Sequence, residues 1–148
     1  MKSKFTIGVF GVIFDDKKRV LLCHRRDYDL WNLPGGGLES YETPWGGLIR
    51  EVKEETGLDV KVLKLIGVYS KPYKNEIVFA FICKRIKGNI TLNEEADKID
   101  YFEVVKLPSN TVPKQVERIK DAVANSELAV FKVQSGRSSI DLLKEGKL

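Results

Sequence analysis

The stretch from residue 35 to residue 58 contains the side chains whose types and spacing could carry out chemistry. Its second half predicts a helix over residues 44–56, on which Glu51, Glu54 and Glu55 share an arc of about 100°. Like charges on adjacent helical turns repel one another, and a divalent cation would remove that cost. Carboxylate oxygens are ligands of Mg²⁺ or Mn²⁺ rather than of Zn²⁺. The arc therefore predicts a metal site, and a solvated acidic helix face is the alternative.

Two features beside the acidic arc favour the metal site over the solvated face. Gly46 and Gly47 together cost a helix about 1–2 kcal/mol relative to alanine, and Gly47 lies in the middle of the arc. Its missing side chain predicts an opening through which something approaches the helix. Arg50 precedes Glu54 by one helical turn, so its guanidinium can hydrogen-bond that carboxylate and fix its direction.

The ends of this helix are marked by residues with defined capping roles. Thr43 is a good N-cap, Pro44 suits the first helical position, and Gly57 suits a left-handed C-cap. The glycines at residues 35–37 predict a loop before the helix, where backbone can approach a ligand closely. A stripe separate from the acidic arc is predicted to face the core. It consists of Trp45, Leu48, Ile49, Val52 and Thr56.

These residues fit one longer pattern. Gly36 is followed after five residues by Glu42, and after a further seven by R-E-V-K-E-E-T-G-L at residues 50–58. The arrangement resembles the full signature of the Nudix hydrolase family, G-x5-E-x7-R-E-U-x-E-E-x-G-U, where U is a bulky aliphatic residue. A chance match has odds on the order of 10⁻⁷ at average residue frequencies. The resemblance implies an α/β/α sandwich with a mixed β-sheet between helices. It also implies a pyrophosphohydrolase that cleaves a phosphoanhydride bond by water attack on phosphorus.

The resemblance also assigns metal-binding roles one position at a time. Glu51, Glu54 and Glu55 match the main metal ligands of the family. Gly35 matches a backbone carbonyl that can also touch metal, and Glu42 matches an outer carboxylate that often reaches metal through water. The implied cofactor is Mg²⁺, with Mn²⁺ as the alternative.

Further catalytic roles follow from the same resemblance. Arg50, Glu51 and Glu54 are the catalytic residues within the motif, with Arg50 as the orienting partner of the carboxylates. The general base is either a glutamate of the motif or one from a loop outside it. Glu95 precedes the Tyr-Phe pair at residues 101–102 at the spacing of such a loop acid, and Glu94 is the second choice. Two solvated loop acids are the alternative to this assignment.

Substrate contacts are predicted at four positions outside the motif. Arg25 and Arg26 end a strand near the glycine loop, where their guanidinium groups could meet phosphate. Trp31 could stack on a base, and a core tryptophan is the alternative. Tyr73 falls in the region after the motif where the family carries specificity determinants. His24 is interpreted as a surface residue at a strand end rather than as a catalytic base.

The pattern of the rest of the chain indicates an α+β fold that positions this segment. Residues 20–24 are predicted to return antiparallel to the first strand, across a turn at residues 15–18. A second helix is expected over residues 113–124, residues 88–97 are expected to form a polar loop, and no role is assigned to the stretch from Gln134. The predicted strands cover residues 5–14, 20–24, 60–69, 77–85 and 101–105.

Size and composition predict one domain over residues 1–148, of an ordinary globular kind. Hydrophobic residues make up 43% of the chain and charged residues 31%. Cys23 and Cys83 are interpreted as buried free thiols, because their spacing fits neither a metal site nor a disulfide framework. No signal-peptide pattern and no membrane-length apolar run occurs, which predicts a cytoplasmic protein without a membrane partner.

Three functions remain as alternatives at this point. The leading one is an enzyme that acts on a small nucleotide: a nucleoside triphosphate, a nucleotide sugar or a dinucleotide. The second is a pyrophosphohydrolase of RNA 5′ ends, which the net charge of +4 favours weakly. The third is a non-catalytic Nudix domain that senses nucleotides, against which the intact glutamates argue. A homodimer is compatible with the sequence but has no specific support in it.

Overall fold

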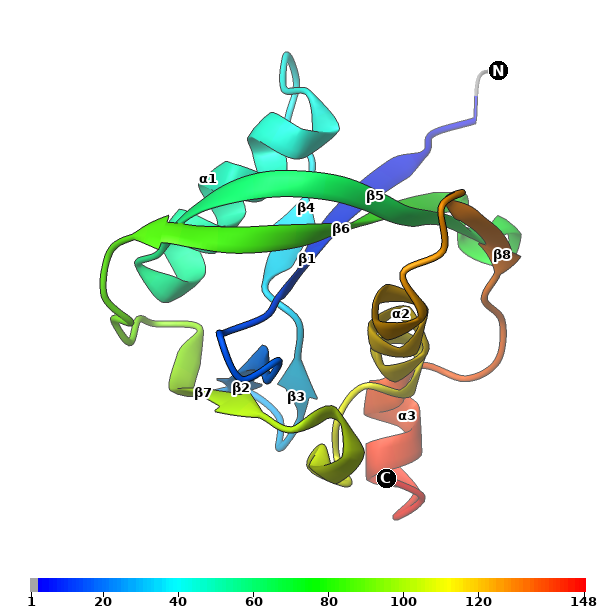
Figure 1. Cartoon of the computed structure of the whole chain (residues 1–148). Coiled ribbons are helices and arrows are strands. Elements are labelled where there is room, and N and C mark those ends of the chain that lie inside the picture. The colour runs from blue at the N-terminus through cyan, green and yellow to red at the C-terminus, as the bar shows by residue number, and fades with distance from the viewer. Residues whose placement is uncertain (1–2) are drawn as a thin grey trace.

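A mixed five-stranded sheet forms the centre of the computed structural model, which describes residues 3–148 (Figure 1). The strands of this sheet are β1 (Thr6–Ile13), β4 (Gly35–Gly37), β5 (Asp59–Lys71), β6 (Glu76–Lys87) and β8 (Val130–Val133). Their spatial order is β4-β1-β6-β5-β8. The β1–β6 and β5–β8 pairs are parallel, and the β1–β4 and β5–β6 pairs are antiparallel. Strands β5 and β6 are the long ribbons that cross the middle of Figure 1.

Two helices lie on opposite faces of this sheet. Helix α1 (Pro44–Thr56) covers one face, and helix α2 (Pro113–Ala124) lies on the other (Figure 1). A short third helix, α3 (Ser139–Lys144), lies beside α2 near the C-terminal end of the chain. The predicted arrangement of a mixed sheet between helices is therefore confirmed, and both predicted helices have the predicted bounds.

Strand β1 shows how the sheet supplies two separate cores. Successive side chains of a strand point to opposite faces. Val9 and Ile13 accordingly pack with Leu48 of α1, whereas Val12 packs with Ile119 of α2. All five side chains are fully buried. Because both faces of β1 are covered, the strand reads as a continuous apolar run in the sequence.

The caps of α1 form as predicted. The Thr43 side chain accepts a hydrogen bond from the Gly46 amide at 3.0 Å, which satisfies one of the free N–H groups at the helix start. Gly57 ends the helix with φ of 80°, and its amide donates to the Lys53 carbonyl. A residue with a side chain would be strained in that left-handed conformation. These caps fix where α1 begins and ends, and so where its glutamates lie along the chain.

Strand β2 does not form the predicted hairpin with β1. It belongs to a second, three-stranded sheet in the order β3-β2-β7, and one isolated antiparallel bridge joins Val20 to Phe14, the residue after β1. Leu21 packs into the α1 core and Leu22 into the α2 core, so β2 closes both cores from below the main sheet. An apolar run alone does not specify the pairing partner, which is why the prediction failed. The strands are β2 (Val20–Arg25), β3 (Trp31–Asn32) and β7 (Ala96–Phe102).

Other segments depart from the prediction in smaller ways. The glycines at residues 35–37, expected to form a loop, form strand β4 instead, because their backbone pairs antiparallel with the edge of β1. The strand expected over residues 101–105 lies earlier, as β7, and a 3-10 turn, η2 (Val104–Lys106), follows it. A second 3-10 turn, η1 (Pro72–Lys74), joins β5 to β6. The stretch without an assigned role contains α3.

Cys23 and Cys83 are buried free thiols, as predicted. Burial raises the pKa of Cys83 to about 12, so this thiol stays protonated at neutral pH. Within residues 3–148, no helix combines the length and the apolar character that a membrane crossing requires.

Candidate active site

Arg50 holds three of the carboxylates that the sequence predicts to lie together. Its guanidinium donates to both oxygens of Glu42, at 2.6 and 2.8 Å, in the bidentate geometry that gives strong ion pairs. Its Nη1 atom donates to Glu51 at 3.1 Å and to Glu54 at 3.2 Å. The Arg50 hydrogen bonds lower the pKa of Glu42 to about 2. The predicted bond from Arg50 to Glu54 is present, and Glu42 is the stronger partner.

Glu55 lies on the other side of the same helix turn in a different environment. One carboxylate oxygen accepts a hydrogen bond from the Gly35 amide of β4 at 3.2 Å. No lysine or arginine of the described chain hydrogen-bonds this carboxylate. Burial, together with the negative charges of Glu51 and Glu95, raises the pKa of Glu55 to about 8, against the lowering effect of the Gly35 amide. Glu55 is therefore a partly buried acid in a region of excess negative charge.

Two glycines shape the space around these carboxylates. A Cβ atom on Gly36 would lie 2.8 to 2.9 Å from the carboxylate atoms of Glu51, closer than real side chains approach. Glycine at this position therefore lets β4 pass directly beside the acidic helix. Gly47 does not leave the predicted opening, because Leu38 and Glu42 fill the space. A Cβ on Gly47 would meet the Leu38 Cδ1 atom at 2.5 Å, so this glycine serves close packing.

The loop that carries Glu95 is tied to the C-terminal end of α1. The Thr91 amide donates to the Thr56 carbonyl at 2.9 Å, and the Asn93 side-chain amide donates to the Glu55 carbonyl. The Asn93 side-chain oxygen accepts from the Glu95 amide at 2.8 Å and from the next amide at 3.0 Å. Asn93 thus fixes the backbone of Glu95 against the helix. Asn93 was not among the predicted site residues, although an asparagine whose side chain hydrogen-bonds the backbone two residues further on is a known turn pattern.

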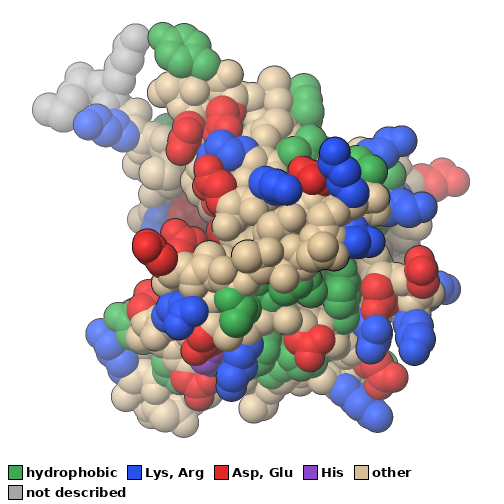
Figure 2. Space-filling view, turned by 90° about the vertical axis from the view of Figure 1, so that its left-hand side faces the viewer, with side chains coloured by type: hydrophobic (Ala, Val, Ile, Leu, Met, Phe, Trp, Pro, Cys, Tyr) green, Lys and Arg blue, Asp and Glu red, His purple; other side chains and the backbone are tan. Residues whose placement is uncertain are grey.

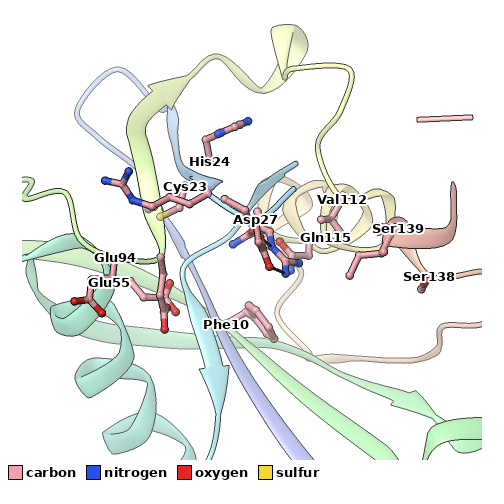
Figure 3. A pocket seen from close by; sticks show the side chains of 16 residues that line it. Phe10, Cys23, His24, Asp27, Glu55, Glu94, Val112, Gln115, Ser138 and Ser139 are labelled. Atoms are coloured by element: carbon pink, nitrogen blue, oxygen red, sulfur yellow. Dashed lines mark hydrogen bonds and ion pairs between the residues drawn. The ribbon is translucent and has the colours of Figure 1, made fainter. Parts of the chain in front are cut away.

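A cavity of about 600 Å³ joins Glu55 and Glu95 to more distant parts of the chain. Figure 2 shows acidic and basic side chains crowded beside a hollow of the surface. In the close view of Figure 3, Glu55 and Glu94 lie at one end, whereas Gln115, Val112, Ser138 and Ser139 lie toward the other. The remaining lining residues include Phe10, Asn32, Ala96 and Ile140. One end of the cavity is therefore acidic. The other, the neutral end, combines apolar groups with neutral hydrogen-bonding groups, and Asp27, which lies beside Gln115, is paired with Arg25.

The structure brings two of the four predicted substrate contacts to this cavity. Arg25 and Arg26 line it. Arg25 forms a bidentate pair with Asp27 at 2.7 and 2.8 Å, and Arg26 donates to the Asn93 carbonyl at 2.8 Å. Trp31 and Tyr73 do not line the cavity.

Both of these aromatic residues have other neighbours. The Trp31 ring packs edge-on against Phe102, with centroids 4.9 Å apart, and against His24. This corresponds to the core alternative considered for Trp31. Tyr73 lies in η1, where its hydroxyl accepts a hydrogen bond from Lys114 at 2.7 Å.

His24 is more buried and better connected than a surface residue at a strand end. Its Nδ1 atom lies 2.7 Å from Asp97, and its Nε2 atom lies 2.8 Å from Asp29. Both partners are carboxylates and can only accept, so both ring nitrogens donate when the ring is protonated. Burial lowers the pKa of His24, but the bonds to Asp29 and Asp97 outweigh this effect and leave the pKa raised. This imidazolium joins β2 to β7 beside the cavity.

The donor set suits a hard divalent cation, although no ready-made metal geometry is present. In the described part of the chain, no three Asp, Glu, His or Cys side chains are arranged to hold a metal ion. Arg50 instead uses oxygens of Glu42, Glu51 and Glu54. Glu55 has no such partner among the described residues. Its pKa is raised first by burial and then by the charges of Glu51 and Glu95, which a cation would neutralise.

Comparison with known proteins agrees with this geometry. The model of the NUDIX domain family matches residues 4–124. A putative 8-oxo-dGTP diphosphatase of Bacillus subtilis is 29% identical over 143 residues, which covers 95% of this chain and 96% of that protein. A MutT-like protein of Streptomyces ambofaciens is 33% identical over 118 residues, covering 80% and 77% respectively.

Further similarity comes from an archaeal enzyme and from a solved structure. An ADP-ribose pyrophosphatase of Methanocaldococcus jannaschii is 37% identical over 109 residues, covering 69% of this chain and 64% of that enzyme. The crystal structure of a NUDIX hydrolase from Nitrosomonas europaea has the same fold, with a TM-score of 0.81, 20% identity, and coverage of 92% and 82%. With the family model matched over most of its length, the chain belongs to the Nudix hydrolase family.

Proposed function

We propose that this Nudix hydrolase is a Mg²⁺-dependent pyrophosphohydrolase that cleaves the phosphoanhydride of a nucleoside diphosphate linked to another moiety, and that the whole chain works as one domain. The observation that carries this proposal is the cavity with two unlike ends. Its acidic end contains Glu55, a partly buried carboxylate without a cationic partner among the described residues. At its neutral end the charged side chain beside Gln115, Asp27, is paired with Arg25. A nucleotide also has two unlike ends. Its phosphates bind divalent cations, which suits the acidic end of the cavity, and its heterocyclic base is neutral, which suits the other end. The volume of about 600 Å³ lies within the range of small-molecule sites.

The residues of α1 would hold the cation. Glu51, Glu54 and Glu55 provide carboxylate oxygens, the Gly35 carbonyl adds a neutral oxygen, and Glu42 acts from outside through Arg50. Nudix proteins in general depend on a divalent metal, and the bound cation supplies Lewis acidity at the phosphoryl oxygens. Arg50 orients Glu51 and Glu54, so their direction is set before any ligand arrives.

Glu95 is the proposed general base. Its loop is fastened to α1 by Asn93, and its charge acts on Glu55 across the acidic end of the cavity. From that position Glu95 can accept the proton of the attacking water. Arg25 and Arg26 on the cavity wall would meet the negative oxygens of the substrate.

The neutral end would bind the base. The Leu33 amide can only donate, so the Gln115 side chain must turn its oxygen toward it, at 2.5 Å. The NH₂ group of Gln115 is then left for the cavity. Asn32 donates its own NH₂ group to the Leu33 carbonyl at 3.2 Å, which leaves its oxygen as an acceptor. A donor and an acceptor beside the Phe10 ring suit the edge of a purine.

The test is a substrate panel with Mg²⁺. The panel contains 8-oxo-dGTP, dGTP, ADP-ribose and a 5′-triphosphorylated RNA, read out as phosphate, pyrophosphate and mononucleotide. We expect at least one small nucleotide to exceed the RNA by about 100-fold in kcat/KM. A preference for the RNA end would support the alternative pyrophosphohydrolase. Binding of nucleotides without turnover would instead support a sensor, and either result would overturn the proposal.

A further inference from the structure

The segment after β8 reaches the same cavity as the acidic residues of the motif. The family model ends at residue 124, before this segment begins. Ser138, Ser139 and Ile140 nevertheless line the cavity together with Glu55 and Glu95. Figure 3 places Ser138 and Ser139 at the end of the cavity away from Glu55. Part of the cavity wall therefore lies outside the region that carries the family signature.

A buried polar pair anchors this segment to α2. Gln134 is 3% exposed and Arg118 is 1% exposed. The Gln134 side-chain oxygen accepts two hydrogen bonds from Arg118, at 2.8 and 3.1 Å. Its NH₂ group donates to the Lys114 carbonyl at 2.8 Å and to Glu117 at 2.9 Å. All hydrogen-bonding groups of the Gln134 amide are thus used by one helix.

Burying the Arg118 guanidinium in this pair costs desolvation free energy, which the contacts of Arg118 must offset. A buried guanidinium is expensive unless its donors are satisfied, and here it also packs over the rings of Phe10 and Tyr69 at 5.2 and 5.4 Å. Phe10 lines the cavity, so Arg118 supports both the cavity wall and the segment that closes it. The fold fixes the point where the chain turns toward Ser138.

The side chains that follow the anchor have the chemistry of a neutral ligand. The Ser138 oxygen accepts the Asp141 amide at 3.1 Å as the cap of α3, so its hydrogen remains free to donate. Ser139 adds a second hydroxyl and Ile140 an apolar group. Together with Gln115 they form a wall without a formal charge. Such a wall favours a sugar hydroxyl or a base over a phosphate, because none of these four side chains is a cation.

We infer that Ser138, Ser139 and Ile140 form a substrate-contacting wall that selects for the nucleoside part of the substrate, and that Gln134 is the positioning residue that holds this wall in place. The inference rests on the proposed function, since it takes the cavity as the substrate site. It assigns specificity to a segment that lies outside the matched family region.

The experiment compares two probes that divide the substrate into its parts. dGMP represents the nucleoside end and inorganic pyrophosphate the phosphate end, and calorimetry with Mg²⁺ gives the Kd of each. Ser139→Trp fills the neutral end, and we expect it to weaken dGMP by about tenfold or more while pyrophosphate changes by less than about twofold. Gln134→Ala should weaken dGMP binding by a smaller factor and leave pyrophosphate binding nearly unchanged. For the hydrolysed nucleotide, KM should rise by a larger factor than kcat falls.

Ser135→Trp is the matched control, because it adds the same side chain to an exposed serine of the same segment. We expect it to bind both probes as the unchanged protein does. Should Ser139→Trp fail to fold by circular dichroism, Ser139→Ala with Ile140→Ala removes the same contacts without adding bulk and is expected to weaken dGMP alone. Equal losses for both probes, or unchanged dGMP binding, would overturn the inference. A protein that binds dGMP selectively but hydrolyses nothing would overturn the proposed function instead.

Discussion

The two sides of the acidic turn of α1 differ in how their charge is balanced. On one side, Arg50 hydrogen-bonds Glu42, Glu51 and Glu54, and the pKa of Glu42 falls to about 2. On the other side, Glu55 is partly buried, lacks a cationic partner within residues 3–148, and has its pKa raised to about 8. The difference teaches that only part of the carboxylate cluster is complete within the protein. The Arg50 side is already positioned, whereas the Glu55 side is the one that a cation from solution is proposed to complete.

Removal of divalent metal should have the largest effect on this comparison. We expect chelator to abolish turnover and Mg²⁺ or Mn²⁺ to restore it, because no protein cation can replace the metal beside Glu55. The measurement is product release against added metal after exhaustive chelation. Zn²⁺ at matched concentration is the control, since carboxylate oxygens suit it less well. Full activity without metal would show that the unbalanced negative charge around Glu55 does not serve to bind a catalytic cation.

Replacement of Glu95 tests the Glu55 side of the cluster, where no lysine or arginine of the described chain balances the negative charge. A general base contributes about 10²–10⁴-fold to the rate, whereas a solvated loop acid contributes almost nothing. Glu95→Gln should therefore lose most of kcat, together with the acidic limb of the pH profile. Glu94→Gln is the matched control and should stay near the unchanged protein. Equal and small effects at both positions would return the base to Glu51, Glu54 or Glu55.

Glu54→Gln and Glu55→Gln compare the two sides directly. Each removes a proposed metal ligand, and we expect turnover to fall by about 10²-fold or more in both. Their effects on stability without metal should differ. At pH 9 in chelator, Glu55→Gln should unfold at a higher temperature than the unchanged protein, because it removes a buried charge. The exposed Glu54 is already paired with Arg50, so Glu54→Gln should not stabilise the protein. Equal stabilisation by both would contradict the comparison.

Replacement of His24 should have the smallest effect of these changes. Like Arg50, protonated His24 has carboxylate partners, Asp29 and Asp97, and it joins β2 to β7. Its pKa is raised in the folded state, so its protonated form stabilises the protein below about pH 6.5. That contribution is lost as the pH rises through the raised pKa. His24→Gln should therefore lower Tm by about 2–4 °C at pH 5.5 and by less at pH 9. Thermal unfolding at both pH values measures this, and a loss that grows with pH would contradict the assignment.

The features that could be predicted from the sequence are those that depend on neighbours in the chain. The bounds of α1 follow from Thr43, Pro44 and Gly57, each of which acts within one helical turn. The pairing between Arg50 and Glu54 is equally local. For the same reason the whole acidic turn could be described before its surroundings were known.

The features that could not be predicted depend on partners far along the chain. Nothing near β2 specifies that it pairs with β7 rather than with β1, because both faces of the strand are apolar. Gly47 was expected to leave an opening, but its space belongs to Leu38, whose direction the sequence does not give. Asn93 and Gln134 act through side-chain amides on distant backbone, and neither residue type marks a site by itself.

The pairing of β1 with β6 and of β2 with β7 has a consequence for how the protein comes into being. Both pairs join strands far apart along the chain, and contacts of this kind form late because a long loop must close first. A chain emerging from the ribosome contains the whole of α1 once residue 57 is made. Glu95 reaches that helix only when β7 has found β2. Catalytic competence should therefore appear in a single late step, and an incomplete nascent chain would carry the signature of a hydrolase without its reactivity.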